Sequence, residues 1–329
     1  MDWNGIAQNA LELLVDEANA SFREAAHTVA FPRAQGFLVD EDEQTGDVFA
    51  RAIIADALLD AARAGFRVAA LIDCEVDHLI DSRLESGVGG WKYFPNLREL
   101  PPDADDLAQV MQVLIRAGRR DAVERHCERA IEVLLRDNMH ADGSFETWIV
   151  PGANCSFDEE LQQQWIDRAW GRGADSEVTA NLLYALALYD RDRFRNEIAR
   201  GCEFIESRQE PSGAWSSTWY HGPYYGTYVA VRLLAACAPQ SQAIERARRF
   251  LDAAQPQDAL STALALLAAT AVSANVAIDA RPLASIEPVP FIRMELGRPT
   301  GRPWQTLTYS STCVTAAFVL KAALARKSC

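Results

Sequence analysis

The 329-residue sequence is poor in positive charge: 32 Lys and Arg residues stand against 46 Asp and Glu residues, which gives a formal net charge of −14 at pH 7. Nucleic-acid binding depends on basic residues that pair with phosphates, so nucleic acid is not an expected partner. The seven cysteines are scattered and form no Cys-x-x-Cys pair, which argues against a zinc or redox site of that type. This cysteine usage fits a reduced, cytoplasmic compartment.

Signals for export, membrane insertion and nucleotide binding are also lacking. The N-terminus has no basic region followed by an apolar run, so we expect no secretory signal. Residues 259–278 are uncharged and long enough to cross a bilayer, but eight Ala and five polar residues favour a buried helix of a soluble core. No Walker loop or dinucleotide fingerprint occurs, so no nucleotide cofactor is expected.

Apolar residues recur at spacings of three and four through most of the chain, which predicts helices. The predicted helices span residues 11–26, 47–64, 105–117, 121–136, 178–189, 193–207, 228–238, 244–254, 259–272 and 314–325. No alternating segment is long enough to predict a strand. The sequence therefore predicts an all-α fold.

The predicted helices are of two kinds, highly charged and sparsely charged, and the two kinds alternate about six times. Because each sparsely charged helix needs cover from its neighbours, the alternation predicts a single α/α toroid of about six inner and six outer helices over residues 1–329. Two separate bundles are the alternative, but no Pro/Gly/Ser linker divides the chain. One rim of the toroid should hold the starts of the inner helices, at Asp47, Asp105, Glu177, Thr227, Asp258 and Thr312.

Three loops between an outer and an inner helix carry the pattern Gly-x-aromatic and form an internal repeat, ending at Trp91, Phe145 and Trp215. The third loop follows Gln209, and an indole that stacks over this amide and the helix end would act as a structural clamp. The alternative interpretation is turn chemistry alone.

Asp103, Asp105 and Asp106 follow two prolines at the start of an inner helix. One interpretation is that they cap this helix, where negative charge is favoured. The other is catalytic, because three carboxyl groups cannot all ionise cheaply in an apolar pocket and one tends to keep its proton. A neutral carboxylic acid at the mouth of an apolar cavity is a general acid.

Aromatic residues are concentrated before another inner helix and recur elsewhere. Their faces stabilise cations without acting as nucleophiles, so an acid opposite them could protonate an alkene and guide the resulting carbocation. For any single ring, core packing is the alternative. The candidates for the lining of the substrate site are Phe49, Trp91, Trp215, Trp219, Tyr224, Tyr225, Tyr228, Trp304 and Tyr309.

These residues resemble a known family. Residues 103–106 match the D-x-D-D acid motif of class II terpene cyclases, and residues 213–227 resemble the G-x-W-x3-W-x5-Y-G-T segment of squalene–hopene cyclases. The Gly-x-aromatic loops are similar to the glutamine–tryptophan repeats of that family. The similarity covers about residues 89–236, and the chain length implies one barrel in place of the usual two.

The resemblance implies an α/α-barrel enzyme of the isomerase type: a class II terpene or meroterpenoid cyclase acting on a linear isoprenoid shorter than squalene. It implies Asp105 as the proton donor, with Asp103 and Asp106 as its hydrogen-bonding partners. The expected partner is a small hydrophobic isoprenoid, and transient contact with a membrane is compatible with such a substrate. The oligomeric state is not set by the sequence.

A metal site was weighed because the protein prenyltransferases of this superfamily hold zinc through Asp, Cys and His. Asp73, Cys74 and His78 have these residue types, but Cys74 and His78 lie on a predicted outer helix. We therefore expect no metal and no cofactor. His221, in the aromatic cluster, is expected either to hydrogen-bond the acid or to cap a loop.

Two other functions remain open. α/α toroids also serve as glycosidases and lyases, which need a second acid or base across the cleft, and Glu177 or Asp258 could supply it. A non-catalytic isoprenoid-binding protein would keep the cavity but would not need Asp105.

Overall fold

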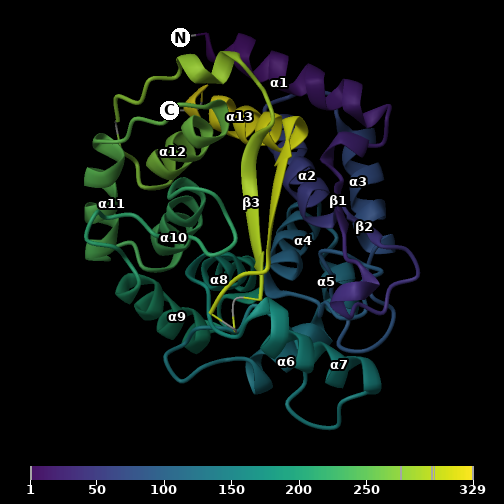
Figure 1. Cartoon of the computed structure of the whole chain (residues 1–329). Helices are drawn as coiled ribbons and strands as arrows, with labels where there is room; N and C mark the ends of the chain where they lie inside the picture. Colours follow the sequence, from purple (N-terminus) through teal and green to yellow (C-terminus); the bar gives the residue numbers. More distant parts are fainter. Residues whose placement is uncertain (1, 275, 298, 300, 328–329) are drawn as a thin grey trace.

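A closed ring of helices forms the centre of the molecule in the computed structural model, which describes residues 2–274, 276–297, 299 and 301–327. Each ring helix packs against the next, and the last packs against the first (Figure 1). The prediction of an α/α toroid is confirmed. In ring order the inner helices are α2 (Val48–Arg63), α4 (Ala104–Arg116), α8 (Ser176–Asp190), α10 (Tyr224–Cys237), α12 (Ala259–Ala271) and α13 (Thr312–Lys327).

Outer helices cover the joints between inner helices. The outer helices are α1 (Trp3–Ala18) on α13, α3 (Ala69–Asp81) on α2 and α4, α5 (Arg120–His126) on α4, α6 (Glu128–Asp137) after α5, α9 (Arg195–Ser207) on α8 and α10, and α11 (Gln242–Asp252) on α10 and α12. At the sixth position, the short helix η4 (Arg281–Ala284) packs on α12.

Several helix boundaries differ from those predicted. The single helix predicted over residues 121–136 is divided at Cys127 into α5 and α6. The first helix begins at Trp3, because the Asp2 side chain caps it by accepting a hydrogen bond from the Gly5 N–H at 3.0 Å. The chain leaves this helix before Phe22, whose φ is 53°. Two helical elements lie between α6 and α8, namely α7 (Phe157–Trp165) and the π-helical turn η3 (Ile166–Trp170).

Contacts between inner helices join residues at similar depths. Arg116, at the end of α4, pairs with Asp56 and Asp60 in the second half of α2. Lys321 of α13 pairs with the same two carboxylates at 2.5 and 2.7 Å. Asn181 of α8 bonds to Gln112 of α4 and to Arg232 of α10, and Leu267 of α12 lines one pocket with Asp60 and Lys321. The inner helices therefore run parallel, and their starts lie at one end of the ring, as predicted for Asp47, Asp105, Glu177, Thr227, Asp258 and Thr312.

The inner helices are buried on nearly all sides because most of their residues are small or apolar. In α12, ten of 13 residues are buried, and Ala accounts for five of the ten. Outer helices such as α11 bury only one face. Among the described residues, no helix has the length and apolar character needed to span a membrane.

The expectation that the chain has no strands is wrong. β1 (His27–Ala30) pairs with β2 (Glu43–Gly46), and β3 (Val289–Leu296) pairs with β4 (Gln305–Ser311), both in antiparallel register. The alternation of β4 is regular but only seven residues long. In β3, Pro290 and a register shift between Pro290 and Ile292 break the alternation, which concealed the strand.

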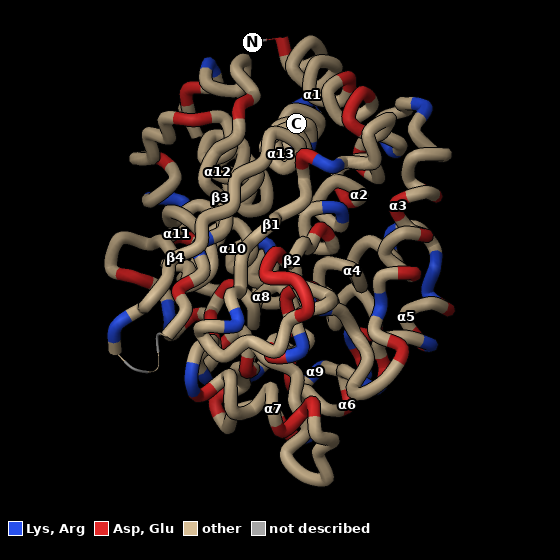
Figure 2. Tube along the Cα trace, turned by 45° about the vertical axis from the view of Figure 1, so that its right-hand side comes forward, with Lys and Arg blue, Asp and Glu red and all other residues tan. Residues whose placement is uncertain are grey.

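The β3–β4 hairpin lies across one end of the ring (Figure 1). The segment before α10 pairs with it, because the Arg293 N–H donates to the Trp219 carbonyl and the His221 N–H donates to the Phe291 carbonyl, both at 2.8 Å. Figure 2 shows acidic and basic residues spread over the outer helices and loops, with an acidic run at residues 40–43 beside β2.

Candidate active site

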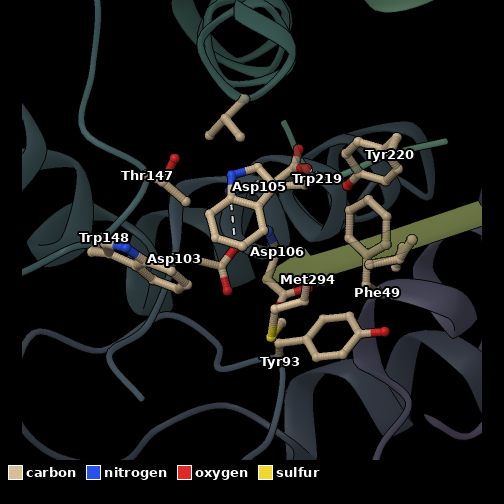
Figure 3. A pocket seen from close by; sticks show the side chains of 12 residues that line it. Phe49, Tyr93, Asp103, Asp105, Asp106, Thr147, Trp148, Trp219, Tyr220 and Met294 are labelled. Atoms are coloured by element: carbon tan, nitrogen blue, oxygen red, sulfur yellow. Dashed lines mark hydrogen bonds between the residues drawn. The ribbon is translucent and has the colours of Figure 1, made fainter. Parts of the chain in front are cut away.

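An apolar cavity lies between the start of α4 and the β3–β4 hairpin (Figure 3). We call it the acid cavity, and we call Asp103, Asp105 and Asp106, which line it, the acid cluster. The space between the lining atoms of the cavity is about 420 Å³, a figure that includes the solvent at its mouth. Its lining residues are Phe49, Tyr93, Asp103, Asp105, Asp106, Thr147, Trp148, Val178, Trp219, Tyr220, Ile292 and Met294.

Asp103 is the N-cap of α4. Its Oδ1 accepts hydrogen bonds from the N–H groups of Asp105 and Asp106 at 3.1 and 2.8 Å. Burial raises the pKa of Asp103 to about 7, although these backbone bonds act in the opposite direction. The capping interpretation of the acidic cluster is therefore correct for Asp103. With a pKa of about 7, the Asp103 carboxyl group is also close to half protonated at neutral pH.

Asp105 is buried and has a donor at each carboxyl oxygen. Oδ1 accepts from the Asn181 Nδ2 at 2.6 Å, and Oδ2 accepts from the Tyr220 hydroxyl. Burial raises the pKa of Asp105 to about 6, and the two hydrogen bonds limit the rise by stabilising the carboxylate. The group can thus hold a proton near neutral pH and can also be stabilised after losing it.

Asn181 is fixed in the orientation that Asp105 needs. Its Oδ1 accepts from the Gln112 Nε2 at 2.8 Å and from the Arg232 Nη2 at 2.7 Å. Both neighbours are donors, so the amide oxygen must face them and the amide N–H points at Asp105. The Arg232 guanidinium also lies 4.3 Å from the centre of the Tyr184 ring. Asn181 is not among the site residues predicted from the sequence, although it is a lone amide in an apolar helix.

Asp106 is the most deeply buried member of the cluster. Neither of its carboxyl oxygens accepts a hydrogen bond from the described residues. Burial and the adjacent charge of Asp103 raise its pKa well above the ordinary value. The raised pKa favours the protonated form of Asp106, and in that form Asp106 adds no negative charge beside Asp103 and Asp105.

Aromatic rings form much of the remaining wall. The indoles of Trp148 and Trp219 meet edge to face with centres 5.5 Å apart. Their N–H groups are bound to the Gly171 carbonyl at 2.8 Å and to Asp175 Oδ2 at 2.7 Å. Phe49 and Tyr220 are neighbours with ring centres 5.9 Å apart. The cavity thus pairs a carboxylic acid with rings that can stabilise a cation.

Comparison with known proteins places the chain in a family. Residues 70–260, more than half of the chain, match the family model described as the squalene-hopene cyclase C-terminal domain. The chain belongs to this family.

Several solved structures share the fold of this family member. A protein from Actinoplanes is 20% identical, with a TM-score of 0.68, and the match covers 99% of this chain and 100% of that chain. The type II terpene cyclase MstE from Scytonema is 17% identical, with a TM-score of 0.64 and coverages of 99% and 98%. The ent-copalyl diphosphate synthase from Streptomyces platensis is 19% identical, with a TM-score of 0.60 and coverages of 88% and 52%. At these identities the likeness establishes the fold.

Of the nine aromatic residues predicted for the site of this squalene-hopene cyclase family member, Phe49 and Trp219 line the acid cavity. Trp91 and Trp215 lie outside it and act as clamps. Their indole N–H groups donate to the carbonyls of Leu79 and Ile205, both at 2.7 Å. These two tryptophans are thus bound to the ends of outer helices, as the clamp interpretation of the repeat expects.

Gln209 braces the turn that precedes Trp215. The Gln209 Nε2 donates to the Gly213 carbonyl at 2.8 Å and to the Ala243 carbonyl at 2.9 Å. Gly213 has a φ of 94°, and a Cβ there would lie 2.4 Å from the Arg246 carbonyl oxygen. Glycine is therefore required at this turn.

The other five predicted rings lie away from the acid cavity. Tyr224 packs on Phe250, and Trp304 is 41% exposed. Tyr309 is buried, but its hydroxyl donates to the Ala25 carbonyl at 2.6 Å. Tyr225 and Tyr228 line a second cavity of about 250 Å³ that lies deeper in the ring. The sequence could not separate these positions because every one of them is aromatic and near a helix start.

The remaining candidates have structural partners. Glu177 is buried and accepts from the N–H groups of Thr218 and Trp219 at 2.5 and 3.0 Å. Asp258 caps α12 through the Ser261 N–H at 2.7 Å. Neither carboxylate lines the acid cavity. Glu177 and Asp258 are therefore not placed to act there as the second acid or base that a glycosidase or lyase would need. The His221 backbone joins the loop to β3, and its side chain is exposed.

The residues weighed as zinc ligands do not come together. Cys74 is exposed, and His78 lies 3.3 Å from an Asp47 carboxylate oxygen. In the part of the chain that the structure describes, no group of three or more His, Cys, Asp or Glu residues is arranged to hold a metal ion.

Proposed function

We propose that this chain is a class II terpene or meroterpenoid cyclase that protonates the terminal alkene of a linear isoprenoid. The observation that carries the proposal is the buried carboxyl group of Asp105, which faces an apolar cavity between aromatic rings and has a pKa raised to about 6. A neutral carboxylic acid in such surroundings has the equipment of a general acid.

The first step transfers the Asp105 proton to one carbon of the terminal alkene. The π electrons form the new C–H bond, the other alkene carbon becomes positive, and the next alkene of the chain attacks it to close a ring. Asp105 is left as a carboxylate, which Asn181 and Tyr220 stabilise by hydrogen bonds. The pKa values of Asp103 and Asp106 are raised, which favours their protonated forms and limits the repulsion that this new charge meets.

The cavity composition supports an isoprenoid as substrate. Apart from Asp103, Asp105 and Asp106, the described residues of the lining are aromatic or aliphatic with one threonine, and none of them is Lys or Arg. A polar head group would therefore lie outside this cavity. MstE, which shares the fold, is described with geranylgeranyl dihydroxybenzoate as its substrate. We propose a linear isoprenoid shorter than squalene for this chain.

The test is incubation of the protein with prenyl alcohols, prenyl diphosphates and prenylated aromatics in deuterium oxide, followed by mass spectrometry. The cyclised product should gain one non-exchangeable deuterium on carbon. Asp105→Asn keeps the size of the side chain but removes its acidic proton, so turnover should fall by about 100-fold or more. Asp192→Asn, at an exposed turn, is the matched control and should change nothing.

Other results would select the alternatives. A folded Asp105→Asn variant with full cyclisation contradicts the mechanism. A prenyl compound that binds equally well to the native protein and to Asp105→Asn, with no turnover by either, indicates a non-catalytic binding protein. Release of reducing sugar from an oligosaccharide indicates a glycosidase.

A further inference from the structure

A cyclisation that begins with a proton must also end, either by loss of a proton from the final cation or by capture of water. One candidate acceptor is the Asp105 carboxylate left by the first step. Any other acceptor must touch the cavity and must not already be bound to Asp103, Asp105 or Asp106. The hydrogen-bond partners of the polar groups that line the cavity decide which of them can receive this proton.

Most of these polar groups already have one. The Tyr220 hydroxyl is bound to Asp105. The Thr147 hydroxyl donates to Asp175 Oδ2 at 2.9 Å. The two indole N–H groups are donors and cannot accept a proton. Among the described lining residues, this leaves Tyr93 as the hydroxyl with a neutral base for a partner.

The Tyr93 hydroxyl lies 3.0 Å from Nδ1 of His27. Tyr93 is in the loop before α4, and its ring lines the cavity beside Met294 (Figure 3). His27 is in β1, where the rings of Phe94 and Tyr309 surround it at centre distances of 5.5 and 5.0 Å. The imidazole is outside the cavity, and Tyr93 stands between the two.

The geometry points to Tyr93 and His27 as the relay that ends the cyclisation, an inference that rests on the proposed function. A C–H bond next to the final cationic carbon breaks, its electron pair forms the product alkene, and the proton passes to the Tyr93 oxygen. The hydroxyl proton of Tyr93 moves at the same time to His27 Nδ1, which yields neutral tyrosine and an imidazolium. The imidazolium then releases its proton to water.

The properties of both groups suit this role. Burial lowers the pKa of His27 to about 4, so the imidazole is unprotonated at neutral pH and free to accept. A carbocation is a far stronger acid than any imidazolium, so a weak base is sufficient. Burial raises the pKa of Tyr93 well above its ordinary value, so the phenol is neutral between turnovers.

Tyr93→Phe removes the hydroxyl and keeps the ring. Since protonation by Asp105 is untouched, we expect substrate consumption and the single deuterium on carbon to persist. The yield of the native alkene relative to other alkenes and alcohols should fall by about tenfold or more. Tyr189→Phe is the matched control, because its hydroxyl binds Glu128 on an outer helix, and it should keep the native product.

In this relay His27 takes a proton from Tyr93 and does not touch the substrate. Its variants test whether His27 accepts this proton or only holds the Tyr93 side chain in place. His27→Leu should give the same altered product mixture as Tyr93→Phe. His27→Asn places an amide oxygen near the Nδ1 position and should restore part of the native alkene. Thermal unfolding followed by circular dichroism identifies variants that have lost the fold, and the Tyr93→Phe comparison decides the question if the His27 variants unfold.

The failure of this inference and the failure of the proposed function give different results. If the native protein cyclises no isoprenoid, the function itself is wrong. If it cyclises and Tyr93→Phe keeps both the fold and the native product mixture, the relay is overturned, and the Asp105 carboxylate left by the first step becomes the acceptor.

Discussion

At the scale of single residues, Asp105 is controlled by two opposing effects. Burial favours its protonated form, while hydrogen bonds from Asn181 and Tyr220 favour the carboxylate. The balance leaves the pKa near 6. A much higher value would make the proton hard to transfer, and an ordinary value would leave no proton to transfer at neutral pH.

The first prediction concerns pH. Because the acid must be protonated to act, kcat/KM for cyclisation should be highest below pH 6 and should fall about tenfold per pH unit above it. Stability should move in the same direction: the raised pKa means that the folded state keeps a proton that the unfolded chain loses near pH 3.8, so this contribution is full below pH 3.8 and is lost as the pH rises through 6. A kcat/KM that rises steadily from pH 6 to 8 would contradict the assignment.

The second prediction concerns the Tyr220 hydroxyl. Tyr220→Phe removes one donor from the Asp105 carboxylate and should raise its pKa, so the alkaline limb of the kcat/KM profile should move upward by about one pH unit. The maximal rate should fall because the carboxylate left after proton transfer is less stabilised. The pH profile of Tyr189→Phe should match that of the native protein, and an unmoved limb in Tyr220→Phe would show that this hydroxyl does not act on Asp105.

The acid cluster could be found from the sequence because its three carboxyl groups lie within four residues, whereas its partners could not. Asn181 and Tyr220 are 76 and 115 positions away from Asp105, and only the ring brings them together. The same holds for Met294, which reaches the cavity from a strand that the sequence did not predict.

At the scale of elements, the β3–β4 hairpin is the part of the site that the helical pattern does not contain. It contributes Ile292 and Met294 to the cavity wall and forms backbone bonds with the segment that carries Trp219 and Tyr220. The hairpin thus closes the cavity and also fixes the position of a hydrogen-bond donor to Asp105.

The third prediction concerns Met294, the residue of the hairpin that lines the cavity near Tyr93. Met294→Ala should enlarge the cavity and lower KM for isoprenoids that are one or two isoprene units longer than the native substrate. The substitution should also lower the free energy of unfolding by about 2 kcal/mol. Met111→Ala is the matched control, because Met111 is fully buried in α4 and does not line the cavity. It should lose similar stability without a change in chain-length preference. Equal changes in both variants would show that Met294 does not set the length.

Helices were predictable where charge and period agreed, and the inner and outer assignments follow the sequence closely. The repeat also predicted that Trp91 and Trp215 hold the ends of outer helices, whereas the stacking of the Trp215 indole on the Gln209 amide stays a prediction. The strands could not be predicted, since β3 contains a proline and a bulge, and its pairing partners are set by the ring below it.

At the scale of the whole molecule, the ring must be closed between its first and last segments. Glu24, which lies between α1 and β1, accepts hydrogen bonds from the N–H groups of Thr312 and Cys313, at 2.5 and 3.0 Å, and from the Ser311 hydroxyl at 2.7 Å. Residues nearly 290 positions apart in sequence thus join the start of α13 to the N-terminal segment. Burial acts to raise the pKa of Glu24, but these bonds outweigh it and the pKa is lowered.

The fourth prediction tests this closure. Glu24→Gln removes the negative charge at the start of α13 and should lower the free energy of unfolding by about 1 kcal/mol. Because the pKa of Glu24 is lowered, its contribution is present above pH 4.5 and is lost as the pH falls further, so the difference between the two proteins should vanish in acid. Thermal unfolding at pH 7 and at pH 3 measures both effects. Glu12→Gln, on the exposed face of α1, should leave the midpoint unchanged at both pH values.

The parallel inner helices have an electrostatic consequence for a reaction that passes through cations. The positive ends of their macrodipoles all lie at the rim that holds the cavity. The positive potential of these helix ends alone would disfavour a carbocation there. Five of the six helices carry a carboxyl group at that end, from Asp47, Asp103, Asp175, Asp258 and Glu24. In their ionised forms these groups oppose the positive ends of the dipoles and make the potential at the rim less positive. An ammonium analogue of the cyclising cation should therefore bind more tightly than its neutral carbon counterpart in a competition assay.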